Sequence, residues 1–183
     1  GDIDLKNHNP TGNIKFKDVS VVFDEAIVLD EINLEIPLGQ TVAIAGKTGS
    51  GKTTLVNLLP RMTDVTRGAV EIDGIDVRKY KLNVLREMIG FVPQEAYLFS
   101  DSIINNLEYG QSDPTPENVS TALNVSRLSK DLEQLDNKLE TLIGERGASL
   151  SGGQKQRAAL ARTVLKNAPI LVLDDSLSHV DTN

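Results

Sequence analysis

A glycine-rich stretch has the residue types and the spacing of a loop that binds phosphate groups: Gly46-Lys47-Thr48-Gly49-Ser50-Gly51-Lys52-Thr53. It fits the pattern of Gly, four residues, then Gly-Lys-Ser/Thr. Glycines let the backbone approach an anion closely, because no Cβ blocks it. The N–H groups at the start of a following helix attract negative charge. We therefore expect a triphosphate site, with Lys52 at the outer phosphates and the Thr53 hydroxyl on Mg²⁺.

The residues around this phosphate loop predict the elements that must hold it. Residues 41–45 form a short apolar, β-prone run, which is typical of a buried parallel strand. Residues 52–59 predict a helix that Pro60 ends. A glycine-rich turn without a ligand is the structural alternative, and the flanking strand and helix make it the weaker one.

A second apolar run ends in acidic residues. Ile170 to Leu173 predicts a buried strand that is followed by Asp174 and Asp175. Ligands of open α/β sheets bind at the carboxyl ends of the strands. We therefore expect Asp174 to complete the Mg²⁺ site that Thr53 begins. An acid that merely caps a strand in a turn is the alternative.

A second candidate helix start lies at Leu150-Ser151-Gly152-Gly153-Gln154. Serine is a preferred N-cap residue, and the next N–H groups would be free to meet an anion. A long amphipathic segment, 154–166, follows and stops at Ala168-Pro169. An ordinary N-cap with a flexible approach is the alternative reading of Ser-Gly-Gly alone.

Bulk properties exclude several classes of function. The chain has 183 residues, a formal net charge of −7 and no cysteine. Disulfides and thiol catalysis are therefore excluded. The acidic balance is unfavourable for a large nucleic-acid-binding face. The apolar runs are far shorter than the roughly 20 residues that span a bilayer, and no signal peptide is visible.

The order of the expected elements predicts an α/β fold. Short strands at 14–17, 19–23, 32–36 and 69–72 predict an N-terminal β lobe, and 89–92 is another strand. Thr115, Pro116 and Glu117 form a good helix start. We divide the chain into a linker or tail, a β lobe with the first part of the α/β core that carries the phosphate loop, a helical subdomain, and the last part of the core: 1–12, 13–96, 97–150 and 151–183.

These motifs together resemble the ATP-binding cassette (ABC) family over nearly the whole chain. The phosphate loop matches the family's Walker A, residues 150–154 match its LSGGQ signature, and Ile170 to Asp174 match Walker B. Gln94 matches the Q-loop glutamine. Further matches are the D-loop at Ser178 and Asp181, the exporter X-loop at 144–147, and the exporter-like residues Phe99-Ser100, Asn106-Leu107 and Tyr109-Gly110.

The resemblance implies a P-loop NTPase (RecA-like) core with an N-terminal antiparallel β lobe and an inserted α-helical subdomain. It implies ATP and Mg²⁺ as cofactors, and catalytic roles for Lys52, Gln94 and Asp175. Gln94 would sense Mg²⁺ and the attacking water. The implied nucleotide-binding residues are Phe23, Gly46, Lys47, Thr48, Gly49, Ser50, Gly51, Lys52, Thr53, Thr54, Ser151, Gly152, Gly153 and Gln154; the implied metal ligands are Thr53, Gln94 and Asp174.

Three features depart from the family pattern. Asp175 stands where the family has the glutamate that polarises water, and aspartate is one methylene shorter, so we expect slow hydrolysis. The chain ends at Asn183, before the family's switch histidine, and His179 in the D-loop does not replace it. We therefore expect a C-terminally truncated piece with exposed apolar surface. Phe23 replaces the tyrosine that stacks on adenine, although a core position on a strand is a nearly equal alternative.

We therefore expect the ATP-hydrolysing domain of a membrane exporter, at the cytoplasmic face of the membrane. Its signature would act in trans on ATP held by a second nucleotide-binding domain in a head-to-tail dimer, and Asp175 favours a heterodimer. A transmembrane domain would send a coupling helix to the area around Tyr97-Leu98-Phe99, which could equally be plain core. No nucleic acid is expected. The alternatives are a regulatory module that binds but barely hydrolyses ATP, and a soluble cassette ATPase.

Overall fold

The computed structural model describes every residue except 2, 5–9, 112, 145–148 and 176–183. It comprises two compact units, Gly1–Ile89 and Gly90–Asn183, which are described separately below. The predicted boundaries at 12, 96 and 150 stay predictions.

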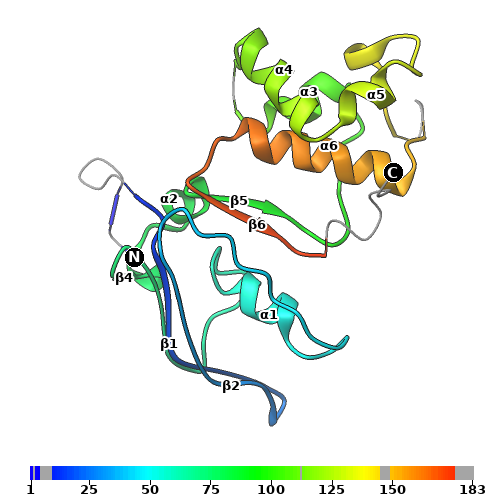
Figure 1. The fold of residues 1–183 in the computed structure, drawn as a ribbon. Coiled ribbons are helices and arrows are strands. Elements are labelled where there is room, and N and C mark those ends of the chain that lie inside the picture. The colour runs from blue at the N-terminus through cyan, green and yellow to red at the C-terminus, as the bar shows by residue number, and fades with distance from the viewer. Residues whose placement is uncertain (2, 5–9, 112, 145–148, 176–183) are drawn as a thin grey trace. The chain divides into compact units, whose positions relative to one another are not determined.

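The first unit is built on an antiparallel sheet with the strand order β2-β1-β3-β4 (Figure 1). Its strands are β1 (Ile14–Phe23), β2 (Ala26–Ile36), β3 (Arg67–Ile72) and β4 (Ile75–Asp76). Asp24 and Glu25 both have positive φ, 45° and 69°, as a two-residue hairpin turn between β1 and β2 requires. The predicted β lobe is therefore present, with the expected strands at 14–17 and 19–23 joined into one strand across an irregularity after Phe16.

One face of this sheet forms the core of the first unit. Phe16, Val19, Val21, Val70 and Ile72 are almost fully buried. This burial follows from the alternation of apolar and polar side chains along β1 and β3. The helices α1 (Lys52–Asn57) and α2 (Leu82–Glu87) and the 3₁₀ turn η2 (Val77–Lys79) add further buried side chains to the unit.

The turn between β3 and β4 fixes the start of β1. The Asp73 carboxylate accepts hydrogen bonds from the Thr11 hydroxyl at 2.6 Å and from the Asn13 backbone N–H at 2.9 Å. Burial raises the pKa of Asp73, but these hydrogen bonds outweigh it and hold the pKa below its usual value. The end of the segment that we assigned to a linker is therefore bound to the β lobe.

Two expectations for the surroundings of the phosphate loop are wrong. Residues 41–45 form no strand, and Val42 and Ile44 are 41% and 39% exposed. Their composition is β-prone, but a strand also needs a neighbour to pair with its backbone. The helix α1 ends at Asn57 and continues as turns through Pro60 to Arg61, so it is shorter than the predicted 52–59.

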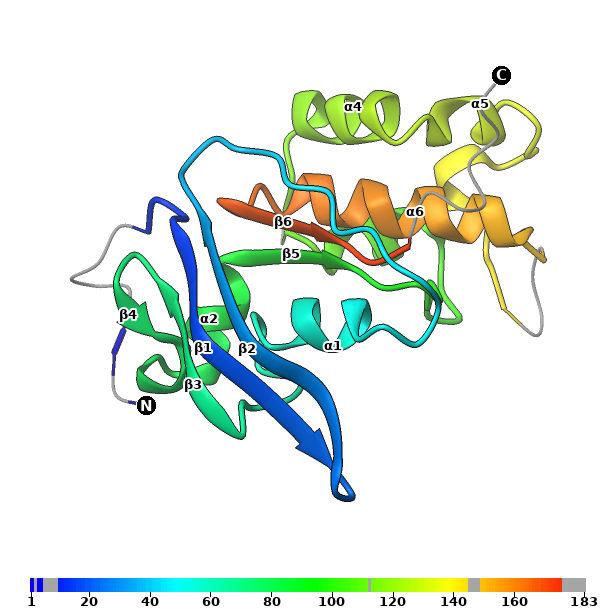
Figure 2. The same ribbon diagram turned by 60° about the horizontal axis from the view of Figure 1, so that its bottom comes forward.

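The second unit combines a two-stranded sheet with helices. It contains β5 (Ile89–Val92, whose first residue closes the first unit), α3 (Ile103–Glu108), α4 (Pro116–Val125), α5 (Leu128–Leu132), the 3₁₀ turn η3 (Lys138–Glu140), α6 (Gly152–Leu165) and β6 (Ile170–Leu173). Helix α6 lies along β5 and β6 in both ribbon views (Figures 1 and 2). The predicted strands 89–92 and 170–173 and the helical stretch between them are confirmed.

A hydrophobic cluster holds the helices of the second unit together. It comprises Ile103, Leu107, Ala122, Leu128, Leu132, Ile143, Leu150, Ala158, Ala161 and Leu165. Thr115 caps α4 as predicted, since its hydroxyl accepts a hydrogen bond from the Asn118 N–H at 3.3 Å.

The strand β6 is buried only on one side. Ile170 and Val172 are buried, whereas Leu171 and Leu173 are 53% and 39% exposed. The expectation of a fully buried strand is therefore wrong for this structure, because the described residues cover one face of β6 and not the other. No helix among the described residues is both long enough and apolar enough to cross a bilayer.

Candidate functional site: a phosphate loop, a capped signature helix and an acidic strand end

Two glycines of the phosphate loop have left-handed backbone. Gly49 and Gly51 have φ values of +81° and +86°, in the left-handed region. Gly51 is also the N-cap residue of α1, and its carbonyl accepts a hydrogen bond from the Leu55 N–H at 2.9 Å. The loop itself is closed by a hydrogen bond from the Ser50 N–H to the Lys47 carbonyl at 3.1 Å.

Close packing leaves no room for a side chain at Gly51, and leaves room at Gly46 only if the Ser50 hydroxyl turns away. A Cβ on Gly51 would lie 2.9 Å from the Val28 carbonyl oxygen of β2, and a Cβ on Gly46 would lie 2.6 Å from Ser50 Oγ. The Lys52 ammonium donates to the carbonyls of Gly46 and Lys47, both at 2.9 Å. This cation therefore lies across the loop, where an anion would be held.

The Phe23 ring lies at the tip of the β1–β2 hairpin and is 46% exposed. Its exposure differs from that of Val19 and Val21 on the same strand, which are buried. Phe23 therefore offers an apolar ring face to a ligand, as stacking on a base requires. Its stacking on adenine remains a prediction.

The signature residues form a complete capping box at the start of α6. The Ser151 hydroxyl accepts from the Gln154 N–H at 3.2 Å, and Gln154 Oε1 accepts from the Ser151 N–H at 2.9 Å. The helix start is thus fixed by its own side chains. A Cβ on Gly152 would meet no atom within 4 Å, so the space beside this residue is open.

The acidic end of β6 and the predicted Q-loop glutamine come together in the second unit. Asp174 is buried, and its N–H donates to the Val92 carbonyl of β5 at 2.9 Å. Asp175 is exposed, has a φ of +47°, and lies with its Oδ2 3.5 Å from Gln94 Nε2. Gln94 and Asp175, two of the residues predicted to be catalytic, are therefore neighbours within this unit.

Other predicted site residues fall in different units or outside the described residues. Thr53 belongs to the first unit and Asp174 to the second, so their shared Mg²⁺ site stays a prediction. Among the described residues, no group of three or more His, Cys, Asp or Glu side chains has a metal-binding arrangement. The D-loop positions Ser178, His179 and Asp181 lie outside the described residues, as do residues 145–147 of the predicted X-loop.

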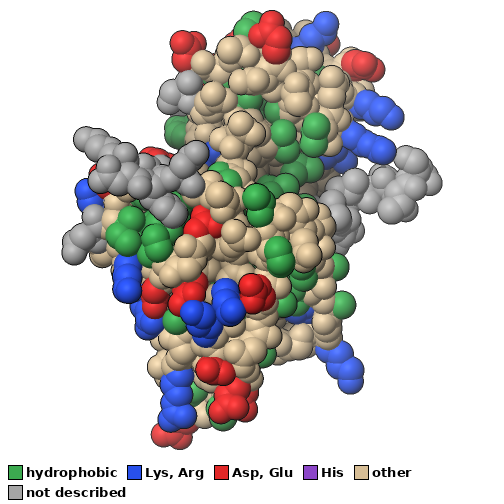
Figure 3. All heavy atoms as spheres, turned by 60° about the vertical axis from the view of Figure 1, so that its left-hand side comes forward, with side chains coloured by type: hydrophobic (Ala, Val, Ile, Leu, Met, Phe, Trp, Pro, Cys, Tyr) green, Lys and Arg blue, Asp and Glu red, His purple; other side chains and the backbone are tan. Residues whose placement is uncertain are grey.

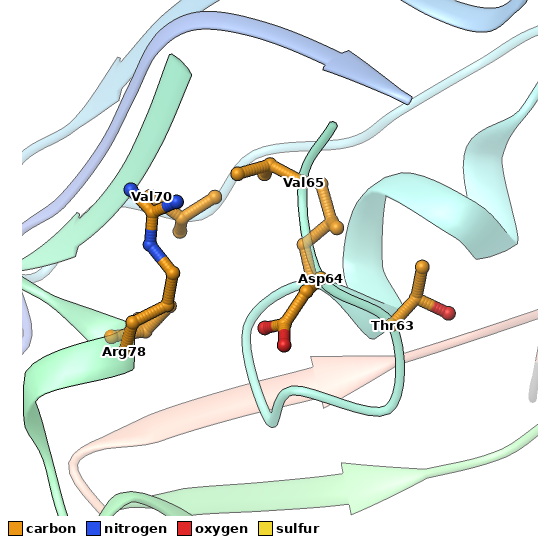
Figure 4. Close-up of a pocket in the computed structure, with 7 residues that line it drawn as sticks. Thr63, Asp64, Val65, Val70 and Arg78 are labelled. Atoms are coloured by element: carbon orange, nitrogen blue, oxygen red, sulfur yellow. The ribbon is translucent and has the colours of Figure 1, made fainter. Parts of the chain in front are cut away.

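A hollow in the first unit is lined by Leu58, Thr63, Asp64, Val65, Val70, Val77 and Arg78 (Figure 4). Its charged side chains have partners: Asp64 pairs with Arg61 at 2.8 Å, and Arg78 pairs with Asp76 at 2.6 Å. The hollow therefore contains no charge that would need a ligand. On the face that Figure 3 shows, acidic and basic side chains lie interspersed, unlike the basic stripe of a nucleic-acid-binding surface.

Two groups of contacts are not predictable from the sequence pattern. The Arg157 guanidinium binds both carboxylate oxygens of Asp131, at 2.6 and 2.8 Å, and joins α6 to α5. Gln156 Nε2 donates to the Pro93 carbonyl at 3.1 Å. Both side chains directly follow the signature, as Lys155-Gln156-Arg157, but nothing in the local pattern identifies their partners.

An exposed aromatic patch consists of Tyr97, Phe99 and Tyr109. The rings of Tyr97 and Phe99 meet edge to face with centroids 5.3 Å apart, and those of Phe99 and Tyr109 lie 4.3 Å apart. Tyr97 and Tyr109 are 67% and 63% exposed. The alternative of a plain core position is therefore wrong for Tyr97 and Phe99, whereas Leu98 between them packs against the hydrophobic cluster. Arg162 supports the patch by donating to the Tyr97 carbonyl at 3.1 Å, and burial lowers the pKa of this arginine.

Comparison with known proteins agrees with these motifs. The family model described as ABC transporter matches residues 29–178. The ATP-dependent lipid A-core flippase of Desulfotalea psychrophila is 44% identical over 170 residues, which cover 93% of this chain and 30% of the relative. The iron-sulfur clusters transporter ATM1, mitochondrial, of Candida albicans is 42% identical over 173 residues, which cover 94% of this chain and 23% of the relative.

A solved structure is also similar. A bacterial Atm1-family ABC exporter with ATP bound matches 98% of this chain with a TM-score of 0.88 and 35% sequence identity. This chain spans 31% of that chain and about 30% of the flippase. The resemblance that the motifs indicated is confirmed over most of the sequence: the chain belongs to the ABC transporter family.

Proposed function

We propose that this chain is the ATP-binding and ATP-hydrolysing domain of a membrane exporter. The observation that carries the proposal is the phosphate loop, whose left-handed Gly49 and Gly51 lead directly into α1. Such a loop exposes backbone N–H groups to phosphate oxygens. The similarity to the flippase and to the Atm1-family exporter supports the exporter class. In finer terms, we assign a P-loop NTPase (RecA-like) core with an inserted helical subdomain.

ATP and Mg²⁺ are the proposed cofactors, and each site residue has a proposed task. Lys52 neutralises charge on the outer phosphates, and Thr53 and Asp174 ligate Mg²⁺. Gln94 would contact the metal and the attacking water. Mg²⁺ held there would supply charge stabilisation for phosphoryl transfer. The remaining loop residues and Phe23 bind the triphosphate and the base.

We assign the signature of this chain to contact with ATP that a second ATP-binding domain holds in a head-to-tail dimer. The capping box fixes the start of α6, and the space beside Gly152 is open. Such a helix start suits contact with the phosphate groups of ATP that another chain holds. ATP would then join the two domains, and its hydrolysis would release them.

Asp175 supports a slow site and hence a heterodimer. Its carboxylate lies beside Gln94 but on a side chain one methylene shorter than the family's glutamate. General bases contribute roughly 10²- to 10⁴-fold to rate and must reach their proton. We propose that ATP at this chain's loop is consumed slowly, and that the signature completes a faster site on the partner. A regulatory module that binds ATP with little hydrolysis is the second candidate, and Asp175 is the observation that favours it.

A transmembrane domain and a location at the cytoplasmic face of a membrane complete the proposal. The exposed Tyr97, Phe99 and Tyr109 rings offer the kind of apolar patch that receives another protein element. Relatives of similar identity are named for different cargoes, lipid A-core and iron-sulfur clusters. We therefore assign ATP-driven export to this domain and no cargo.

The proposal is tested by Asp175→Glu in the full-length transporter with its partner. Release of radiolabelled phosphate is measured together with retention of radiolabelled ATP. We expect turnover at this site to rise at least about tenfold, because the base regains its reach. Asp113→Glu is the matched control, since Asp113 is also exposed and has a positive φ of 53°. Full turnover in the wild type, or no rise in Asp175→Glu, refutes the slow site. If the wild type and Asp175→Glu both retain ATP without hydrolysing it, the regulatory module is supported.

A further inference from the structure

The signature helix is bound to the Q-loop through one buried side chain. Gln156 lies two residues after Gln154 and is only 4% exposed. Its Nε2 donates to the Pro93 carbonyl at 3.1 Å. Pro93 directly precedes Gln94, so this hydrogen bond acts one peptide away from the glutamine assigned to Mg²⁺ and water.

Other contacts also join α6 to β5. Thr163 Oγ1 lies 3.5 Å from the Phe91 carbonyl and donates to the Ala159 carbonyl at 2.8 Å. Gly90 permits the close approach, because a Cβ there would lie 2.8 Å from Thr163 Cγ2. The strand is therefore fixed to the helix along its length, and Gln156 makes the contact at the end nearest the site.

The residue that follows this contact faces the candidate base. Gln94 Nε2 lies 3.5 Å from Asp175 Oδ2, and the Asp174 N–H holds the end of β6 to the Val92 carbonyl at 2.9 Å. The backbone carbonyl of Pro93 cannot move without turning the peptide that carries Gln94. A buried amide that loses its partner also costs free energy, so the contact resists such movement.

We propose that Gln156 is a positioning residue for Gln94: its hydrogen bond to the Pro93 carbonyl sets the direction in which the Gln94 amide meets Asp175 and the attacking water. This inference rests on the proposed hydrolysis at this site. Gln156 touches neither ATP nor metal in this assignment, and it acts only through the Pro93–Gln94 peptide.

A double-mutant cycle in the full-length transporter tests the proposal. Gln156→Met keeps the length of the side chain and removes the donor; Gln94→Ala removes the group that is positioned. Single-turnover release of radiolabelled phosphate is measured in the four combinations, with the ATP concentration dependence. We expect Gln156→Met to slow release about tenfold when Gln94 is present, the effect of losing one hydrogen bond. The ATP concentration for half-saturation should stay within about twofold, because triphosphate binding is not altered.

The Gln94→Ala variant shows whether Gln156 positions Gln94 or only stabilises the fold. There, Gln156→Met should change the rate less than about twofold, since the group that it positions is gone. Equal losses in both backgrounds, or no loss when Gln94 is present, overturn the inference. Thr163→Val is the control, because it removes another polar contact of α6 with β5 and should leave the rate within about twofold.

Two further readouts keep the test decisive. Gln156→Asn retains an amide but is one methylene too short to reach Pro93, so it should reproduce the slow rate even if the methionine variant folds poorly. Thermal unfolding of each variant separates loss of fold from loss of rate. If the wild-type transporter hydrolyses no ATP, the proposed function is contradicted. If it hydrolyses ATP and the Gln156 variants release phosphate at the same rate, only this inference is contradicted.

Discussion

Alanine substitutions in the phosphate loop separate two reasons for its glycines. Gly49 and Gly51 both have left-handed backbone, with φ values of +81° and +86°. A Cβ on Gly49 would have no atom within 4 Å, whereas on Gly51 it would lie 2.9 Å from the Val28 carbonyl oxygen. The two positions therefore share the conformational cost and differ in the steric one.

The backbone conformation and the contact distances set the expected loss of stability for each variant. An L-residue in the left-handed region costs about 1–2 kcal/mol, so Gly49→Ala should lose about that much free energy of unfolding. Gly51→Ala should lose about 2–5 kcal/mol, because overpacking against a backbone oxygen adds about 1–3 kcal/mol. The Val28 carbonyl belongs to β2, whose neighbouring residues Ile27 and Leu29 pair with β1, so it cannot simply move away.

Gly39→Ala is the matched control outside the loop. Gly39 has a φ of +78°, and a Cβ added there would meet no atom within 4 Å, as at Gly49. Urea unfolding followed by circular dichroism measures stability, and binding of a fluorescent ATP analogue measures nucleotide affinity. We expect equal destabilisation in Gly39→Ala and Gly49→Ala, but weakened nucleotide binding only in Gly49→Ala. The reasoning is refuted if Gly51→Ala is no less stable than Gly49→Ala.

Two other predictions concern buried polar groups. Arg157→Met should lower the free energy of unfolding by about 3–5 kcal/mol in a urea titration, because it leaves the Asp131 carboxylate buried without its bidentate partner, and a change below about 1 kcal/mol would contradict this. Burial, and secondarily Asp73, raise the pKa of Tyr80 from 10.0 to about 12. The stability that neutral Tyr80 contributes should therefore be complete below pH 10 and decline as the pH rises toward 12. Tyr80→Phe should flatten this part of a plot of unfolding free energy against pH. An unchanged slope in the variant would contradict the prediction.

The local elements of the site could be predicted because their signals are local. Thr115 followed by Pro116 predicted the start of α4, and Ser151 predicted the cap of α6, since both depend on side chains that reach only two or three residues ahead. The left-handed backbone of Gly49 and Gly51 was not predicted, although glycine is the residue that adopts it most readily. The prediction of a strand at 41–45 was wrong. Composition reflects only the preference of residues for an extended backbone, whereas a strand also needs a neighbouring strand to pair with.

The sequence by itself predicted the local features of this chain: a glycine-rich loop that suits phosphate groups, a helix start at Ser151, and two aspartates after an apolar strand. These follow from residue types at short spacings, where sterics and local hydrogen bonds dominate. Only the tertiary structure decided which distant groups meet, such as Gln156 with Pro93, 63 residues away, and Arg157 with Asp131, 26 residues away. Such pairs depend on how helices and strands pack, and packing is set by the whole chain rather than by any window of it.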